Sequence, residues 1–186
     1  VGSSEARKKL SDWTHMNTVR RIPDNKWYRA GHSAFKPGNL LVIARSWWSI
    51  LGIDRESKQV VWKYEGDHEG GLVRGHDAYM IPEGFPGAGN ILVFDNGLEK
   101  LRPYSMILEI NPISKKVVWS YKDEDKFYSR ASGSHQRLKN GNTFISEDIG
   151  GRAFEVTSAG EIVWEVKGEH RISRAHRYPR GYCPML

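Results

Sequence analysis

The chain has 186 residues, of which 39% are hydrophobic and 11% aromatic, a composition that excludes a disordered protein and suits one domain with a sizeable core. The formal net charge is +6, but lysine and arginine are spread along the chain and form no basic arm. We therefore expect no nucleic-acid partner. No apolar run approaches the ~20 residues of a membrane helix, so we expect no membrane span.

In chain order, the first eleven residues are polar and predict a short N-terminal tail. The rest reads as short strands separated by turn residues. Three similar repeats follow one another, each with a histidine at its opening, then a Gly-Asn turn, an apolar run and a closing Val-Trp pair. The Gly-Asn turns recur about every 51 residues, a period typical of a repeat fold. The predicted segments are blades at 12–64, 75–121 and 133–166, a closing strand at 172–179 and a C-terminal tail at 181–186.

The middle repeat predicts four strands, at 76–81, 91–95, 105–110 and 116–121. The last two are joined by Asn111-Pro112-Ile113-Ser114, which has the residue types of a hairpin turn. Four-stranded antiparallel repeats describe the blades of a β-propeller, so we predict an all-β fold.

Three blades and one strand do not close a ring, because propellers need ~4–8 blades. Open blade edges would expose unpaired backbone and apolar surface. We therefore expect a partial six-bladed ring, completed by earlier blades or by another chain. A second copy would supply the missing three blades as a homodimer.

The three repeat openings place His15, His76 and His135 at the beginning of each first strand, which lines the channel of a propeller. We expect them to surround one opening, where a histidine can act as base, nucleophile or metal ligand. The alternative for each is a hydrogen-bonded structural role. A tri-histidine zinc site is disfavoured, because ligands from successive blades lie too far apart for ~2 Å bonds. We expect no metal and no cofactor.

Arg45 ends the second strand of the first repeat, and its repeat equivalents are Asn96 and Asp148. A charge at the end of an inner apolar strand needs an anionic partner. That partner is either a neighbouring carboxylate or a bound oxyanion such as sulfate, phosphate or carboxylate.

Several stretches together resemble the bacterial arylsulfotransferase family, which transfers sulfuryl groups without a nucleotide sulfate donor. The matching stretches are DWTHMNTV at 12–19, LLVIARS at 40–46, GHDAYMIP at 75–82, GNILVFDNG at 89–97, ILEINPISKKVVWSY at 107–121 and SRAHRYP at 173–179. The resemblance covers most of the chain from 12 to 179. It corresponds to the C-terminal half of the family's six-bladed ring.

The resemblance implies that His76 accepts the sulfuryl group as a sulfohistidine, and that His15 and Arg45 bind the sulfate. With it we assign the catalytic role to His76, His15 and Arg45. We assign substrate binding to Asn17, Asp77, Asn96, His135 and Arg174. It implies an aryl sulfate donor, a phenolic acceptor and a periplasmic or secreted location. A further family histidine belongs to an earlier blade that this sequence lacks. The competing hypothesis is a non-catalytic propeller that serves as a scaffold or as an anion-binding subunit, since a fold alone does not fix a function.

Overall fold

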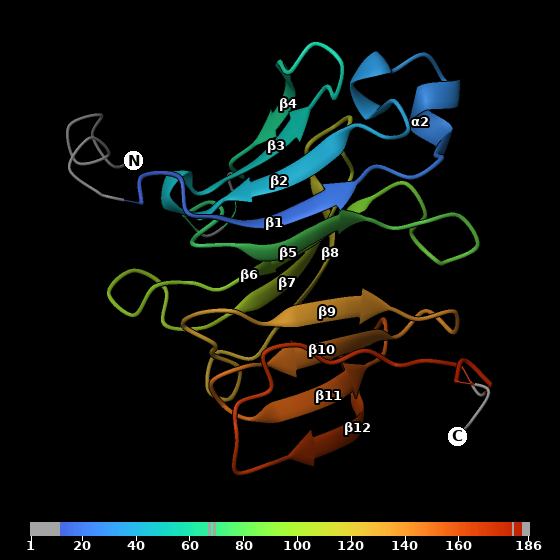
Figure 1. Cartoon of the computed structure of the whole chain (residues 1–186). Helices are drawn as coiled ribbons and strands as arrows, with labels where there is room; N and C mark the ends of the chain where they lie inside the picture. The colour runs from blue at the N-terminus through green and yellow to red at the C-terminus, as the bar shows by residue number, and fades with distance from the viewer. Residues whose placement is uncertain (1–11, 67, 69, 180, 184–186) are drawn as a thin grey trace.

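A computed structural model of the chain describes residues 12–66, 68, 70–179 and 181–183. In these residues it contains three four-stranded antiparallel sheets and little helix (Figure 1). The predicted all-β fold is confirmed. The N-terminal tail predicted for 1–11 lies outside the described residues. No helix in the described part of the chain is long and apolar enough to cross a membrane.

Each sheet follows the chain order of its strands. Between β1 and β2 lie the short helix α2, Lys26–Arg29, and the 3₁₀ turn η1, Ser33–Phe35; a second 3₁₀ turn, η2 at Arg45–Trp47, follows β2. The first blade consists of β1, Met16–Arg21; β2, Leu40–Ala44; β3, Ser49–Ile53; and β4, Val60–Tyr64.

The second and third blades repeat this order without helices. The strands predicted for the middle repeat are observed to within one residue at either end. The second blade consists of β5, His76–Met80; β6, Ile91–Asp95; β7, Met106–Ile110; and β8, Val117–Lys122. The third consists of β9, Ser134–Arg137; β10, Thr143–Glu147; β11, Arg152–Val156; and β12, Ile162–Lys167.

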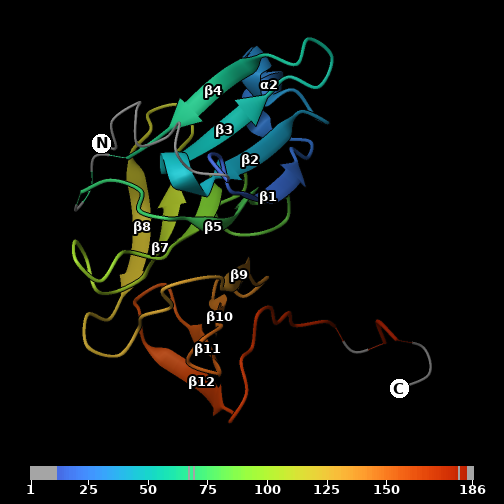
Figure 2. The ribbon, with the colours of Figure 1, turned by 60° about the vertical axis from the view of Figure 1, so that its left-hand side comes forward.

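The three sheets stand side by side as blades of a partial β-propeller. Their first strands, β1, β5 and β9, lie next to one another, while β4, β8 and β12 lie at the outside (Figures 1 and 2). Groups at the beginnings of the first strands therefore come together at one end of the channel, and groups at their ends come together at the other.

The second blade is buried on both faces. In β6, Ile91 and Val93 pack into the core shared with the first blade, and Leu92 and Phe94 into the core shared with the third. Alternate residues of a strand point to opposite faces, so a strand covered on both sides is apolar throughout. This explains why the middle strands read as continuous apolar runs.

The closing tryptophans link the first blade to the second and the second to the third. Trp62 Nε1 donates a hydrogen bond to the carbonyl of Pro112 at 2.9 Å, and Trp119 Nε1 donates to the carbonyl of Ser158 at 2.8 Å. Both carbonyls belong to the hairpin turn of the following blade. The third tryptophan, Trp164, is 41% exposed, and no hydrogen-bond acceptor for its indole is found among the described residues.

The segment predicted as a closing strand is not a β-strand in the structure. Residues 172–179 nevertheless run along β9, because Gln136 donates to the carbonyl of Arg177 at 3.1 Å and accepts from its N–H at 2.9 Å. The Arg177 guanidinium lies over the Trp164 ring, as that of Arg137 lies over Trp119. The segment thus has the position of a first strand. It forms no ladder because its contacts with β9 use side chains.

The tryptophan hydrogen bonds between blades predict unequal effects of one substitution. Trp62→Phe should lower the free energy of unfolding by about 1–3 kcal/mol, because it leaves the buried Pro112 carbonyl without a donor. Trp164→Phe should change it by less than about 0.5 kcal/mol, because that indole is exposed. Urea denaturation of both variants measures this, and equal losses would contradict the assigned role of Trp62.

Candidate functional site

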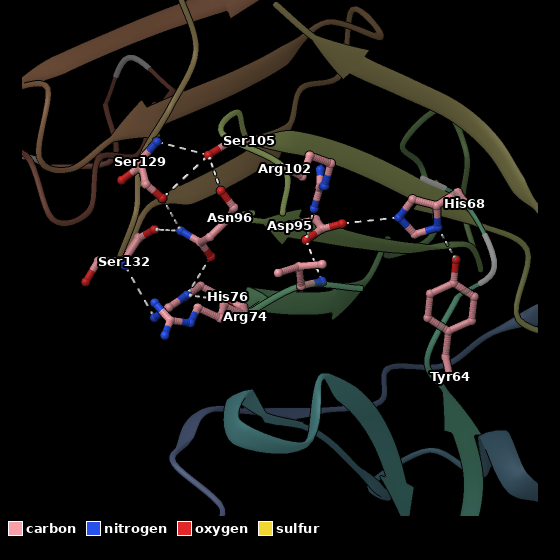
Figure 3. Close-up of polar contacts among 11 residues, drawn as sticks. Tyr64, His68, Arg74, His76, Asp95, Asn96, Arg102, Ser105, Ser129 and Ser132 are labelled. Carbon is pink, nitrogen blue, oxygen red and sulfur yellow. Dashed lines mark hydrogen bonds and ion pairs between the residues drawn. The ribbon is translucent and has the colours of Figure 1, made fainter. Parts of the chain in front are cut away.

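His76 lies at the start of β5, and its ring is held in one orientation by two acceptors. Nδ1 is 2.6 Å from Asn96 Oδ1 and 3.1 Å from the carbonyl oxygen of Arg74 (Figure 3). Both partners only accept hydrogen bonds, so Nδ1 carries the proton. The other nitrogen, Nε2, accepts the backbone N–H of Ser132 at 3.3 Å and is therefore unprotonated.

The orientation of the Asn96 amide is itself determined by its surroundings. Its Nδ2 donates to the carbonyls of Ser129 and Ser132 at 2.7 and 2.6 Å, which leaves Oδ1 facing His76. The Ser105 hydroxyl donates to the Asn96 carbonyl at 2.9 Å. Asn96 is fully buried, so exchanging its oxygen and nitrogen would leave buried groups without partners. From the sequence we assigned Asn96 to substrate binding, whereas in the structure its side chain is hydrogen-bonded to the His76 ring.

The environment of His76 keeps the imidazole neutral. Burial lowers the pKa of His76 most, and the positive charge of Arg45 and the neighbouring His15 lower it further, although the hydrogen bond to Asn96 acts in the opposite direction. A neutral imidazole with a free nitrogen lone pair is the nucleophilic form.

Two arginines and His15 line a cavity of about 350 Å³ at the beginnings of the first strands. This mouth cavity is lined by Asp12, His15, Arg45, Ser46, Trp48 and Arg74. Burial lowers the pKa of Arg45, and repulsion from Arg74 adds to that effect. Two guanidinium groups that repel each other favour an anion between them. Of the three residues predicted to be catalytic, His15 and Arg45 line this cavity and His76 does not. His76 adjoins it through Arg74, whose carbonyl oxygen is 3.1 Å from His76 Nδ1.

His15 precedes β1 and is attached to the loop that carries Arg45. Its Nδ1 is 2.5 Å from Asp12 Oδ2, and its carbonyl accepts the backbone N–H of Arg45 at 3.2 Å. The carboxylate holds a proton on Nδ1, and Nε2 is then the nitrogen that exchanges protons with a ligand. Its φ of 45° belongs to the left-handed region, which sets the direction in which the chain enters β1.

The three histidines do not share one register, contrary to the sequence prediction. In the second blade, His76 of β5 pairs with Phe94 of β6. The equivalent pair in the third blade is Ser134 of β9 with Ser146 of β10, so His135 lies one residue further along its strand than His76 does. A shift of one residue turns a side chain to the other face of a strand. His135 therefore faces a different part of the channel from His76, and His15 precedes the first strand altogether.

The other residues assigned to substrate binding make contacts within the protein. Asn17 donates to the carbonyl of Gly75 at 3.0 Å and ties β1 to the residue before His76. Asp77 is buried, 3.0 Å from Arg20 and 3.9 Å from the half-exposed Arg174. Burial favours protonation of Asp77, but the charges around it outweigh burial and lower its pKa. These contacts indicate that Asn17 and Asp77 hold the first strands in place.

His135 lines a second cavity, of about 330 Å³, at the far ends of the first strands. This distal cavity is lined by residues that include Arg20, Arg21, Tyr79, Phe85, His135 and His176. Neither cavity holds a metal-binding cluster: within the described residues no three His, Cys, Asp or Glu side chains are grouped so that they could hold an ion.

Three groups were missed by sequence reasoning: Asp12 and Arg74, which line the mouth cavity, and the Ser132 N–H, which contacts His76. Arg74 and Ser132 belong to linkers between blades, which have no periodic pattern, and Asp12 is the first residue of the first predicted blade. Arg74 does precede the Gly75-His76 pair directly. Its place two residues before the candidate nucleophile was the available signal.

A family model described as "Arylsulfotransferase (ASST)" matches residues 1–169, which is most of the chain. The chain belongs to the arylsulfotransferase family. A comparison with curated protein sequences gives no significant match.

Solved structures similar to this arylsulfotransferase family member share its fold at low sequence identity. A protein of unknown function from Bacteroides caccae aligns with a TM-score of 0.51 and 19% identity, over 69% of this chain and 42% of that one. A catalytically inactive virginiamycin B lyase from Staphylococcus aureus, solved with quinupristin, aligns with a TM-score of 0.53 and 14% identity, over 84% and 42%. The chain thus spans less than half the length of these proteins.

The buried position of His135 predicts a pH-dependent loss of stability. Burial lowers the pKa of His135 to about 4, against 6.5 for a free histidine. As the pH falls, the histidine of the unfolded state therefore takes up a proton at a higher pH than His135 in the folded state does. The free energy of unfolding is unaffected above pH 6.5 and decreases by about 3 kcal/mol as the pH falls toward 4. In His135→Gln this part of the loss should disappear in urea denaturation series.

The exposed His170 provides the matched control for that measurement. His170→Gln should keep the wild-type pH dependence. A His135→Gln protein that loses stability between pH 7 and 4 as steeply as wild type would contradict the assignment.

Proposed function

We propose that this family member transfers a sulfuryl group from a phenolic sulfate ester to a phenol through a covalent intermediate on His76 Nε2. The observation that carries the proposal is the fixed tautomer of His76. Two acceptors hold the proton on Nδ1, so the unprotonated Nε2 is available as the nucleophile. Arg74, whose carbonyl oxygen is 3.1 Å from His76 Nδ1, lines a cavity together with Arg45, and two guanidinium groups suit the three sulfonate oxygens.

In the first half-reaction, Nε2 of His76 attacks the sulfur of the ester. A nitrogen–sulfur bond forms, the bond between sulfur and the aryl oxygen breaks, and the electron pair leaves with that oxygen. Arg45 and Arg74 stabilise charge on the sulfonate oxygens in the transition state. His15 donates its Nε2 proton to the departing phenolate, and Asp12 holds the remaining Nδ1 proton.

In the second half-reaction, an acceptor phenol enters in place of the product. Its oxygen attacks the sulfur, the nitrogen–sulfur bond breaks, and the lone pair returns to His76 Nε2. His15 takes the proton of the acceptor. The sulfur bound to Nε2 takes the place of the hydrogen bond from the Ser132 N–H, so that N–H becomes a candidate donor to a sulfonate oxygen. The kinetics should be ping-pong.

Further blades are part of this proposal. The chain spans about two fifths of the length of the similar solved structures. Trp164 is 41% exposed and, unlike Trp62 and Trp119, donates to no hairpin turn among the described residues. We propose that preceding blades or a second copy of the chain complete the ring. We also propose the periplasmic or secreted location that the family suggests.

The covalent intermediate is tested by incubating the protein with 4-nitrophenyl sulfate and no acceptor. Wild type should release nitrophenol in a burst, and mass spectrometry should find one sulfuryl group on the peptide that contains His76. His76→Ala should show neither, whereas His170→Ala should behave as wild type. The protein is assayed assembled with the blades that complete its ring. A label on another residue, or no label on that assembled wild type, would contradict the proposal.

The hydrogen bond from Asn96 predicts a change in both rate and pH dependence. Asn96→Ala should lower kcat by about 10- to 100-fold, the range observed when an outer partner that orients a functional histidine is removed. Only neutral His76 attacks, and the lowered pKa places the acid limb of kcat/KM below pH 6.5. Because the Asn96 bond raises that pKa, its removal should move the acid limb to lower pH.

Asn140→Ala, in an exposed turn, is the matched control and should leave both rate and pH profile unchanged. An Asn96→Ala enzyme with a normal rate would show that Asn96 does not position His76. A lower rate with the acid limb unmoved would show a structural role only.

A further inference from the structure

The distal cavity lies at the opposite end of the first strands from the mouth cavity. Arg20 and Arg21 end β1, and Tyr79 and Met80 end β5, whereas His76 begins β5. Four residues of extended chain separate the two ends of β5 by about 13 Å. Every residue that defines the distal cavity belongs to this chain, so the cavity exists without further blades.

His135 is a buried polar side chain without a partner in this cavity. It is 1% exposed, and neither of its ring nitrogens has a hydrogen-bond partner among the residues that the structure describes. Buried polar groups are nearly always hydrogen-bonded, because the loss of water is otherwise uncompensated. The ring is neutral at physiological pH, and no protein group fixes its tautomer, so either nitrogen can donate to a ligand.

Tyr79 adds a second group that the protein leaves incomplete. Its ring stacks on His135 with centroids 5.3 Å apart, and its hydroxyl accepts the backbone N–H of Arg137 at 2.8 Å. No described residue accepts the proton of that hydroxyl. Burial raises the pKa of Tyr79 to about 12, so the proton stays on the oxygen and is available to a ligand.

The remaining walls combine apolar surface with positive charge. Met80, Pro82 and Phe85 form the apolar part, and Arg21 is exposed with no ion-pair partner in the described part of the chain. The neighbouring carboxylates are already paired: Asp77 with Arg20, and Glu109 with Arg137. The net charge that faces the cavity is therefore positive.

We propose that the distal cavity is a second binding site, separate from the sulfuryl-transfer site, for a single-ring aromatic anion such as a benzoate. The ring packs against Phe85 and the apolar wall. The carboxylate receives hydrogen bonds from Arg21 and from a ring nitrogen of His135. A ligand of this kind supplies the partner that His135 lacks. The site does not depend on His76 and can exist in a protein that transfers no sulfuryl group.

The test is a titration of the protein with benzoate, followed by calorimetry and by ¹⁵N NMR of the histidine side chains. Wild type should bind one benzoate, and a His135 ring nitrogen should shift as it acquires a hydrogen bond. Benzyl alcohol, which has the same ring without the charge, should bind at least about 10-fold more weakly, the change expected when a charged hydrogen bond is lost.

Variants locate the site. Arg21→Ala and Phe85→Ala, both at partly exposed positions, should each weaken benzoate binding by about 10-fold. Arg55→Ala, an exposed arginine in the first hairpin turn, and His76→Ala should bind benzoate as wild type does. The proposal is overturned if wild type binds no benzoate, if binding persists in both cavity variants, or if His76→Ala abolishes it.

Discussion

The burial of the second blade between its two neighbours determines where every group of the candidate site lies. Its strands are apolar on both faces because each face forms a core with another blade. Once the blades are packed, their first strands must run side by side, and so must the linkers that lead into them. The tryptophan hydrogen bonds from Trp62 and Trp119 fix each blade to the hairpin of the next.

The candidate nucleophile depends on this packing through the linkers. Arg74 belongs to the linker between the first and second blades, and Ser129 and Ser132 belong to the linker between the second and third. Asn96, at the end of β6, connects His76 with the second of these linkers (Figure 3). The protonation state of the His76 ring is thus a consequence of how three blades meet, and no single blade contains the site.

The sequence was sufficient to predict the blades, because their signals are local: apolar runs of five residues, Gly-Asn turns and closing tryptophans. It also placed His15 and Arg45 at the same end of the blades, where both line the mouth cavity. It was wrong about the common register of the histidines. The strand pairing is irregular in β1, between Met16 and Thr18, and in β5, after His76. Such an irregularity changes which residues oppose one another, and no residue type in the sequence predicts it here. The orienting role of Asn96 could not be predicted either, because its partners are backbone carbonyls of a linker.

The most direct measurement of the central claim is a ¹⁵N NMR spectrum of the histidine side chains at neutral pH. The account predicts that His76 carries its proton on Nδ1 and has an unprotonated Nε2, and that this state persists below pH 6.5. A His76 ring protonated on Nε2, or charged at neutral pH, would contradict it, since neither form has a lone pair on the nitrogen that faces the site.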